Sequence, residues 1–104
     1  MPLTRDFRET VLEDMKDNPD FARAMLNEGI EALRAKEFAV GKSILRDYVN
    51  ATLGFEKLSR KVKIPVKSLM RMLGPSGNPS MNNIFTIIAA LEAHAGIDRR
   101  AAAE

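Results

Sequence analysis

The chain has no cysteine and only one histidine. Without thiols it can form neither a disulfide nor a thiolate metal site, and His94 has no second histidine with which to share a metal ion. No apolar run approaches the roughly 20 residues needed to span a bilayer. The N-terminal residues 1–6 lack the apolar stretch of a signal peptide. We therefore expect a cytoplasmic protein with no metal, no cofactor and no membrane segment.

Groups suited to catalysis are equally scarce. His94 falls near the end of the last expected helix among alanines, where a histidine is usually structural or exposed. Glu9, Glu13 and Asp14 fall on the polar face of an amphipathic helix, which favours a solvated surface over a carboxylate pair with separated pKa values. The stretch Gly74–Gly77 matches neither phosphate-binding fingerprint, because no strand precedes it and no Gly-Lys-Ser/Thr follows. We expect a protein that is not an enzyme.

Apolar residues recur at helical spacing along most of the 104 residues. In the first such segment, Phe7, Val11, Leu12 and Met15 form one stripe. No segment alternates as a strand would, so we expect an all-α protein of one domain. The expected helices are 5–16, Pro19 to about Leu33, 38–53, 55–62, 66–73, and Met81 to about His94. The expected N-caps, in chain order, are Thr4, Asn18 and either Asn78 or Ser80.

The segment 55–73 predicts two short helices joined by a tight turn. Pro65 cannot extend the first helix and biases Ile64 away from helical torsions, yet it suits the start of the second. Ser59 is small where the two helices must approach each other closely. Such a helix-turn-helix is built to place its second helix in a DNA major groove. Its expected core residues are Leu58, Val62, Ile64, Leu69 and either Met72 or Leu73.

Charge is distributed unevenly along the chain. Residues 1–53 carry eight Lys/Arg and ten Asp/Glu, whereas residues 54–104 carry eight and four. Residues 54–73 alone hold six Lys/Arg against one acid. A basic surface of this kind fits contact with phosphates. Charge alone, however, favours a plainer interpretation, a solvated helix face that happens to be rich in lysine.

The outward residues of the second motif helix are Val66, Lys67, Met70 and Arg71, with Ser68 at the margin. Lys67 and Arg71 are one helical turn apart, so each can reach a guanine or a phosphate. Val66 and Met70 can meet thymine methyl groups. The turn, the small residue, the charge and the following loop together favour DNA binding. The alternative is a helical hairpin with an exposed basic surface.

The order of elements resembles the Xre/Cro-type helix-turn-helix domain, in which an Asn-Pro-Ser or Asn-Pro-Thr helix start follows the motif. Here that start is Gly77-Asn78-Pro79-Ser80, followed by MNNIFTIIAALEAHAG. The N-terminal half, with RDFRETVLEDMKDNPDFARAMLNEGIEAL and LRDYVNATLG, resembles the probable addiction-module antidote proteins, which are HigA-like antitoxins. The resemblance covers about residues 5–93.

This resemblance implies a lambda-repressor-like helix-turn-helix bundle with an N-terminal helical extension. Residues 1–36 would form the extension, 37–95 the Xre-type unit and 96–104 a frayed tail of the same single domain. The base-reading residues it implies are Val66, Lys67, Ser68, Met70 and Arg71. The residues it implies at the DNA backbone are Lys57, Ser76, Gly77, Asn78 and Asn82.

The implied function is that of a labile regulator that binds a palindromic operator as a homodimer, represses its own operon and neutralises a small RelE/ParE-like toxin. The acidic residues in 6–20 offer charge complementarity to a basic toxin. In the last helix, Ile84, Phe85 and Ile88 are either a dimer surface or core.

Phe55 stands where many Xre-type domains place a polar Gln or Ser that touches DNA. Its presence is consistent with a second hypothesis, that of a protein-interaction module that has lost DNA binding. A third hypothesis is a stand-alone Xre-type regulator without a toxin.

Overall fold

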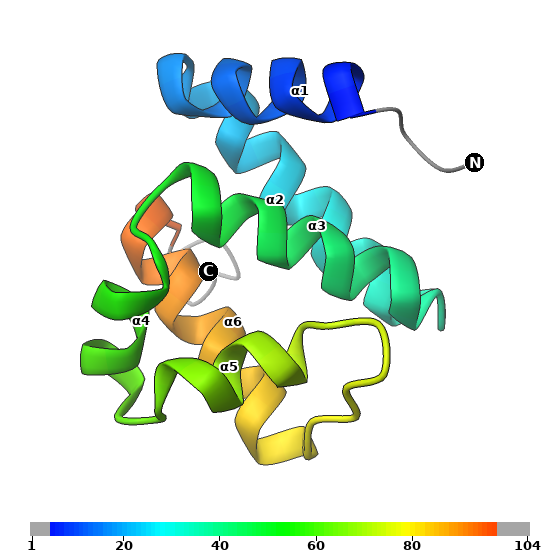
Figure 1. Cartoon of the computed structure of the whole chain (residues 1–104), viewed down its shortest axis with the longest axis vertical. Coiled ribbons are helices and arrows are strands. Elements are labelled where there is room, and N and C mark those ends of the chain that lie inside the picture. The colour runs from blue at the N-terminus through cyan, green and yellow to red at the C-terminus, as the bar shows by residue number, and fades with distance from the viewer. Residues whose placement is uncertain (1–4, 98–104) are drawn as a thin grey trace, which may run out of the picture.

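The computed structural model describes residues 5–97, and every regular element among them is an α-helix. The expected all-α class is thus confirmed (Figure 1). Thr4 and most of the expected frayed tail, residues 98–104, lie outside the described residues. None of the helices in residues 5–97 is long and apolar enough to cross a membrane. The helices are α1 (Arg5–Asp17), α2 (Pro19–Arg34), α3 (Phe38–Ala51), α4 (Phe55–Val62), α5 (Val66–Met72) and α6 (Met81–Ala95).

The helix starts follow the capping residues in the sequence. The Asn18 side chain accepts hydrogen bonds from the backbone N–H groups of Asp20 and Phe21, both at 3.1 Å. Ser80, and not Asn78, caps α6, because its Oγ accepts from the N–H of Asn83 at 3.1 Å. In both cases a side-chain oxygen satisfies donors that the first helical turn leaves unpaired.

Two helices end earlier than the apolar pattern predicts. We expected α3 to reach residue 53, but it ends at Ala51 because the backbone of Thr52 leaves the helical region. The chain then turns through Gly54, whose φ of +84° suits glycine. Helix α5 ends at Met72, one residue before the expected end. Leu73 nevertheless remains a core residue and is fully buried.

Two lysines occupy left-handed backbone conformations in place of glycine. Lys36, with φ of +68°, follows α2, and Lys63, with φ of +58°, ends α4. This conformation is uncommon for a residue with a side chain and most often ends helices at glycine. The chain therefore turns sharply after α2 although residues 33–37 contain no glycine.

One hydrophobic core joins all six helices. Its fully buried members include Leu26 of α2, Leu45 of α3, Leu58 of α4 and Leu69 of α5. Helix α6 contributes Ile87 and Leu91, and α1 contributes Met15. Each short helix thus gains its stability from tertiary burial, because helices of seven or eight residues are marginal alone.

Helices α2 and α3 approach each other closely at two glycines. A Cβ built on Gly41 would lie 2.6 Å from Leu33 Cδ2 and 3.0 Å from the carbonyl oxygen of Gly29. A Cβ on Gly29 would lie 3.0 Å from Ile44 Cγ2. Gly29 therefore permits this crossing rather than interrupting α2.

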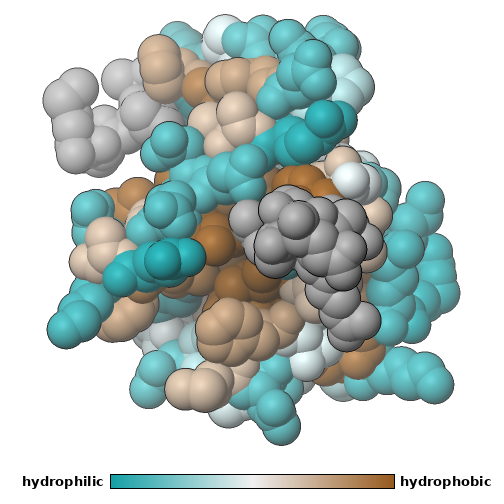
Figure 2. Space-filling model, turned by 180° about the vertical axis from the view of Figure 1, so that it is seen from behind, coloured by the Kyte–Doolittle hydropathy of each residue, from teal (hydrophilic) through white to brown (hydrophobic). Residues whose placement is uncertain are grey.

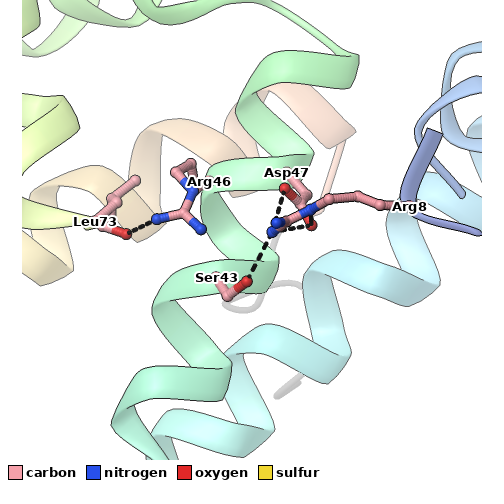
Figure 3. Close-up of polar contacts among 5 residues, drawn as sticks. All are labelled: Arg8, Ser43, Arg46, Asp47 and Leu73. Atoms are coloured by element: carbon pink, nitrogen blue, oxygen red, sulfur yellow. Dashed lines mark hydrogen bonds and ion pairs between the residues drawn. The ribbon is translucent and has the colours of Figure 1, made fainter. Parts of the chain in front are cut away.

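Helix α1 is fixed to α3 by a polar clamp (Figure 3). The Arg8 guanidinium donates to both carboxylate oxygens of Asp47, at 3.1 and 3.2 Å, and to Ser43 Oγ at 3.1 Å. Along the longest axis of the molecule, α1 lies at one end and α5 with the following loop at the other (Figure 1). The two ends therefore present separate surfaces.

Candidate nucleic-acid interface

The turn between α4 and α5 is held by hydrogen bonds at its centre. Ser59 Oγ donates to the carbonyl oxygen of Ile64 at 2.6 Å, and the Lys63 N–H donates to the Ser59 carbonyl at 2.8 Å. Pro65 then precedes the first turn of α5 with φ of −56°. Ser59 thus has two roles. It is small where the two helices approach each other, and its hydroxyl satisfies a backbone carbonyl of the turn.

Helix α5 has one buried face and one exposed face. Leu69 is fully buried. Lys67, Met70 and Arg71 are exposed, and the exposed fraction of Met70 is 52%. Val66 and Ser68 are half-buried, and Val66 packs against the core. Three of the five predicted base-reading residues therefore lie fully on the accessible face, and the other two lie at its edge.

The basic side chains of this segment remain available for a partner. All six are exposed, and none of them takes part in the ion pairs Arg8–Asp47, Arg23–Asp20 and Arg34–Glu31. A surface of one charge sign attracts counterions and polyanions. The six residues are Lys57, Arg60, Lys61, Lys63, Lys67 and Arg71.

The loop after α5 is tied to the rest of the molecule by two basic side chains of α3. Arg46 donates to the carbonyl oxygen of Leu73 at 3.1 Å (Figure 3), and the Lys42 ammonium donates to the carbonyl oxygen of Gly77. Both contacts satisfy carbonyls at or beyond the end of α5, where no further helical turn supplies donors. They fix the position of α5 relative to the core.

Neither of these α3 contacts was predicted from the sequence. The available signal was Lys42 itself, because it shares the inward face of α3 with Leu45 and Val49 at spacings of three and seven residues. A lysine on an apolar face predicts a buried partner for its ammonium. Neither spacing nor charge identifies that partner as a loop carbonyl 35 residues away.

The predicted backbone-contacting residues divide into two groups. Lys57, Ser76, Asn78 and Asn82 are exposed. Gly77 is half-buried, and a Cβ on it would lie 2.1 Å from the Arg71 carbonyl oxygen. The glycine at this position is thus required by packing against the end of α5. Ser76, Asn78 and Asn82 stay accessible around it.

Phe55 lies in the core, with an exposed fraction of 8%. It begins α4 and packs with Leu58 beneath the motif. Phe55 therefore stabilises the start of α4 from within the core. The exposed residues at this end of α4 are Glu56 and Lys57, of which only Lys57 has a charge complementary to an anion.

The three residues of α6 considered for a dimer surface have different environments. Ile88 is buried with an exposed fraction of 8%, and Ile84 is half-buried against the core. Phe85 is 60% exposed. Ile88 therefore belongs to the core and Ile84 packs against it. Of these three residues, only Phe85 projects from the helix into solvent.

His94 near the end of α6 has a lowered pKa, firstly because of its partial burial and then because of the positive charges of Lys61 and Lys57. The unfolded chain takes up a proton near pH 6.5, and the folded chain does so only at a lower pH. Protons therefore favour unfolding, so this contribution to stability is present above pH 6.5 and is lost as the pH falls through the folded pKa.

We accordingly expect the midpoint of thermal unfolding to fall between about pH 7.5 and 5.5, and to fall less in His94→Gln than in the wild type. Circular dichroism melts at matched ionic strength measure both slopes. Because the remaining titrating groups are common to the two proteins, the difference isolates His94. Equal slopes would contradict the assigned shift.

Comparisons of this chain with protein-family models, with curated proteins and with solved structures found no match.

Proposed function

We propose that the protein is a sequence-specific transcriptional regulator that binds double-stranded DNA in the cytoplasm and inserts α5 into the major groove. The observation that carries this proposal is the accessible face of α5, where Lys67 and Arg71 stand exposed on a helix held firmly at both ends. A rigid helix with basic side chains one turn apart suits recognition of guanine edges in the major groove.

Phosphate contacts would come from the elements beside α5. Lys57 on α4, Ser76 and Asn78 in the loop, and Asn82 on α6 are all exposed. Contacts of this kind fix the register of a protein on the duplex without reading sequence. A two-fold homodimer would present two α5 helices to half-sites about 34 Å apart on a palindromic operator, in the manner of lambda-repressor-like proteins.

We further propose, on the sequence resemblance, that the protein is the antitoxin of a toxin–antitoxin pair, with a RelE/ParE-like toxin as partner. The acidic residues Glu9, Glu13, Asp14 and Asp17 are exposed on α1. Helix α1 lies at the end of the molecule opposite α5 (Figure 1). A basic toxin bound there would leave α5 free, so that repression and neutralisation can occur on one molecule.

The test is operator binding by variants of the recognition helix. We expect Lys67→Ala and Arg71→Ala each to weaken binding to the protein's own upstream region by about 1–3 kcal/mol, or roughly 5- to 150-fold, and to relax sequence preference. Electrophoretic mobility shifts at about 150 mM salt, with a shuffled duplex as competitor, measure both effects. Lys16→Ala, an exposed lysine at the far end of α1, is the matched control.

Each outcome selects among the hypotheses. If Lys67→Ala and Arg71→Ala bind the operator as tightly as Lys16→Ala does, α5 is not the recognition helix. If the wild type shows only weak binding that shuffled DNA competes away, the interaction-module hypothesis replaces the regulator. Specific operator binding without capture of the protein encoded beside it would indicate a stand-alone regulator.

A further inference from the structure

A hydrophobic groove opens between α2, the start of α3 and the first turns of α6. Its cavity has a volume of about 360 Å³, within the range of small-molecule sites. Phe38, Met81 and Phe85 border it and keep exposed fractions of 58%, 76% and 60%. Figure 2 shows hydrophobic surface in a hollow near the centre of the rear face, with hydrophilic side chains above it and to its left. Ile30 and Leu33 of α2 form the opposite wall.

Among residues 5–97, the ionisable side chains that line this groove are all cationic. They are Arg34 and Lys42, and no carboxylate of the described chain lines the groove. Arg34 pairs with Glu31 at the surface, whereas Lys42 is 8% exposed and forms no ion pair within residues 5–97. Its hydrogen bond goes to the Gly77 carbonyl, which is a dipole and not a charge. An ammonium has three donors, so two remain for a ligand.

We propose that this groove binds a medium-chain fatty acid, with the apolar tail along α6 and the carboxylate at Lys42. A buried cation in an apolar site gains most from an anionic partner, because few water molecules screen the pair. The ligand that satisfies both features of the groove is therefore a single anionic group on an apolar chain.

A second copy of this chain fits the groove less well than an anion does. In a two-fold contact the same patch meets itself. The described part of the patch offers Arg34 and Lys42 but no acidic residue, so such a contact would place like charges opposite each other. The charge of the groove thus favours a negatively charged small molecule.

Occupancy would act on the loop that follows α5. A carboxylate on the two remaining donors of Lys42 draws the ammonium toward the groove and so weakens its hydrogen bond to the Gly77 carbonyl, which holds the loop to α3. The same loop carries Ser76 and Asn78, so a bound fatty acid would weaken the contact with DNA. This effect on DNA rests on the proposed function, whereas binding in the groove does not.

The experiment is calorimetric titration of the full chain with decanoate, below its micelle concentration and without DNA. We expect saturable binding with one site per chain and no saturable binding of decylamine, which has an apolar tail of similar length and a cationic head. Lys42→Met keeps the apolar stem and should weaken decanoate binding by about 10- to 100-fold. Lys63→Met, the same change at an exposed site outside the groove, should bind as the wild type does.

Phe85→Glu provides a second variant, should Lys42→Met fail to fold. Phe85 is exposed, so the fold tolerates the change, while the added carboxylate repels an anion at the mouth of the groove. Loss of decanoate binding in Phe85→Glu supports the proposal. The proposal is overturned if the wild type does not bind decanoate, if decylamine binds equally well, or if a folded Lys42→Met binds decanoate as the wild type does. Where Lys42→Met does not fold, unchanged decanoate binding in Phe85→Glu overturns it. Sedimentation showing that Phe85→Glu abolishes a dimer would assign the groove to a second copy and also overturn it.

Discussion

Replacing Leu69 by alanine is expected to lower the free energy of unfolding by about 2–5 kcal/mol. Leu69 is fully buried and is the centre of the inward face of α5. Truncating it removes apolar burial and leaves a cavity that a seven-residue helix, held at both ends, cannot close by moving inward. Native proteins of this size have only about 5–15 kcal/mol of stability, so the loss is a large fraction of the total.

Thermal and urea unfolding followed by circular dichroism measure this loss, with a fall in Tm of roughly 10 °C or more. Met70→Ala is the matched control, because Met70 is the next residue in the same helix and is 52% exposed. Surface substitutions of this kind usually change stability by less than about 0.5 kcal/mol. If Leu69→Ala and Met70→Ala have the same Tm, the assigned inward and outward faces of α5 are wrong.

Replacing Gly77 by alanine is expected to cost about 1–3 kcal/mol of stability and to reduce operator affinity as well. The added Cβ would lie 2.1 Å from the Arg71 carbonyl oxygen and 2.5 Å from that of Met72. Both are backbone atoms at the end of α5, so the loop must move away from the helix. That movement also withdraws the Gly77 carbonyl from the Lys42 ammonium.

Gly74→Ala tests whether the loss expected at Gly77 comes from the steric clash of the added Cβ or from the lower backbone flexibility of alanine. A Cβ on Gly74 would approach the Met70 carbonyl oxygen to 3.2 Å, which small adjustments relieve. We therefore expect Gly74→Ala to remain close to the wild type in both Tm and operator binding. Equal losses in the two variants would show that chain flexibility, and not the close approach at Gly77, sets the requirement for glycine.

The helices and the motif core could be predicted well because those features depend on local patterns. Burial at Leu58 and Leu69 follows from periodicity, and the cap at Asn18 follows from the chemistry of its side chain. Between Met72 and Leu73 the pattern alone could not choose. The structure buries Leu73 fully and leaves Met72 half-buried.

Two kinds of feature could not be predicted: a tight turn made without glycine, and contacts between residues far apart in the chain. The left-handed conformation of Lys36 closes a turn for which the sequence offers no glycine. The hydrogen bond from Lys42 to Gly77 joins residues far apart in the chain. Phe55 is similar, because its burial depends on how α4 meets the core and not on its neighbours in sequence. Whether α5 reads DNA stays a prediction from both the sequence and the structure.

The double attachment of α3 bears on how this chain can be shortened. Ser43 and Asp47 of α3 hold α1, while Lys42 and Arg46, on the adjacent stripe of the same helix, hold the end of α5 and its loop. A truncated chain that begins at residue 37 would keep the helix-turn-helix motif but would lack α2, which packs against α3. Buried apolar surface at Leu45 would then face water. Removal of the first two helices is therefore expected to yield an aggregating fragment rather than a minimal DNA-binding unit.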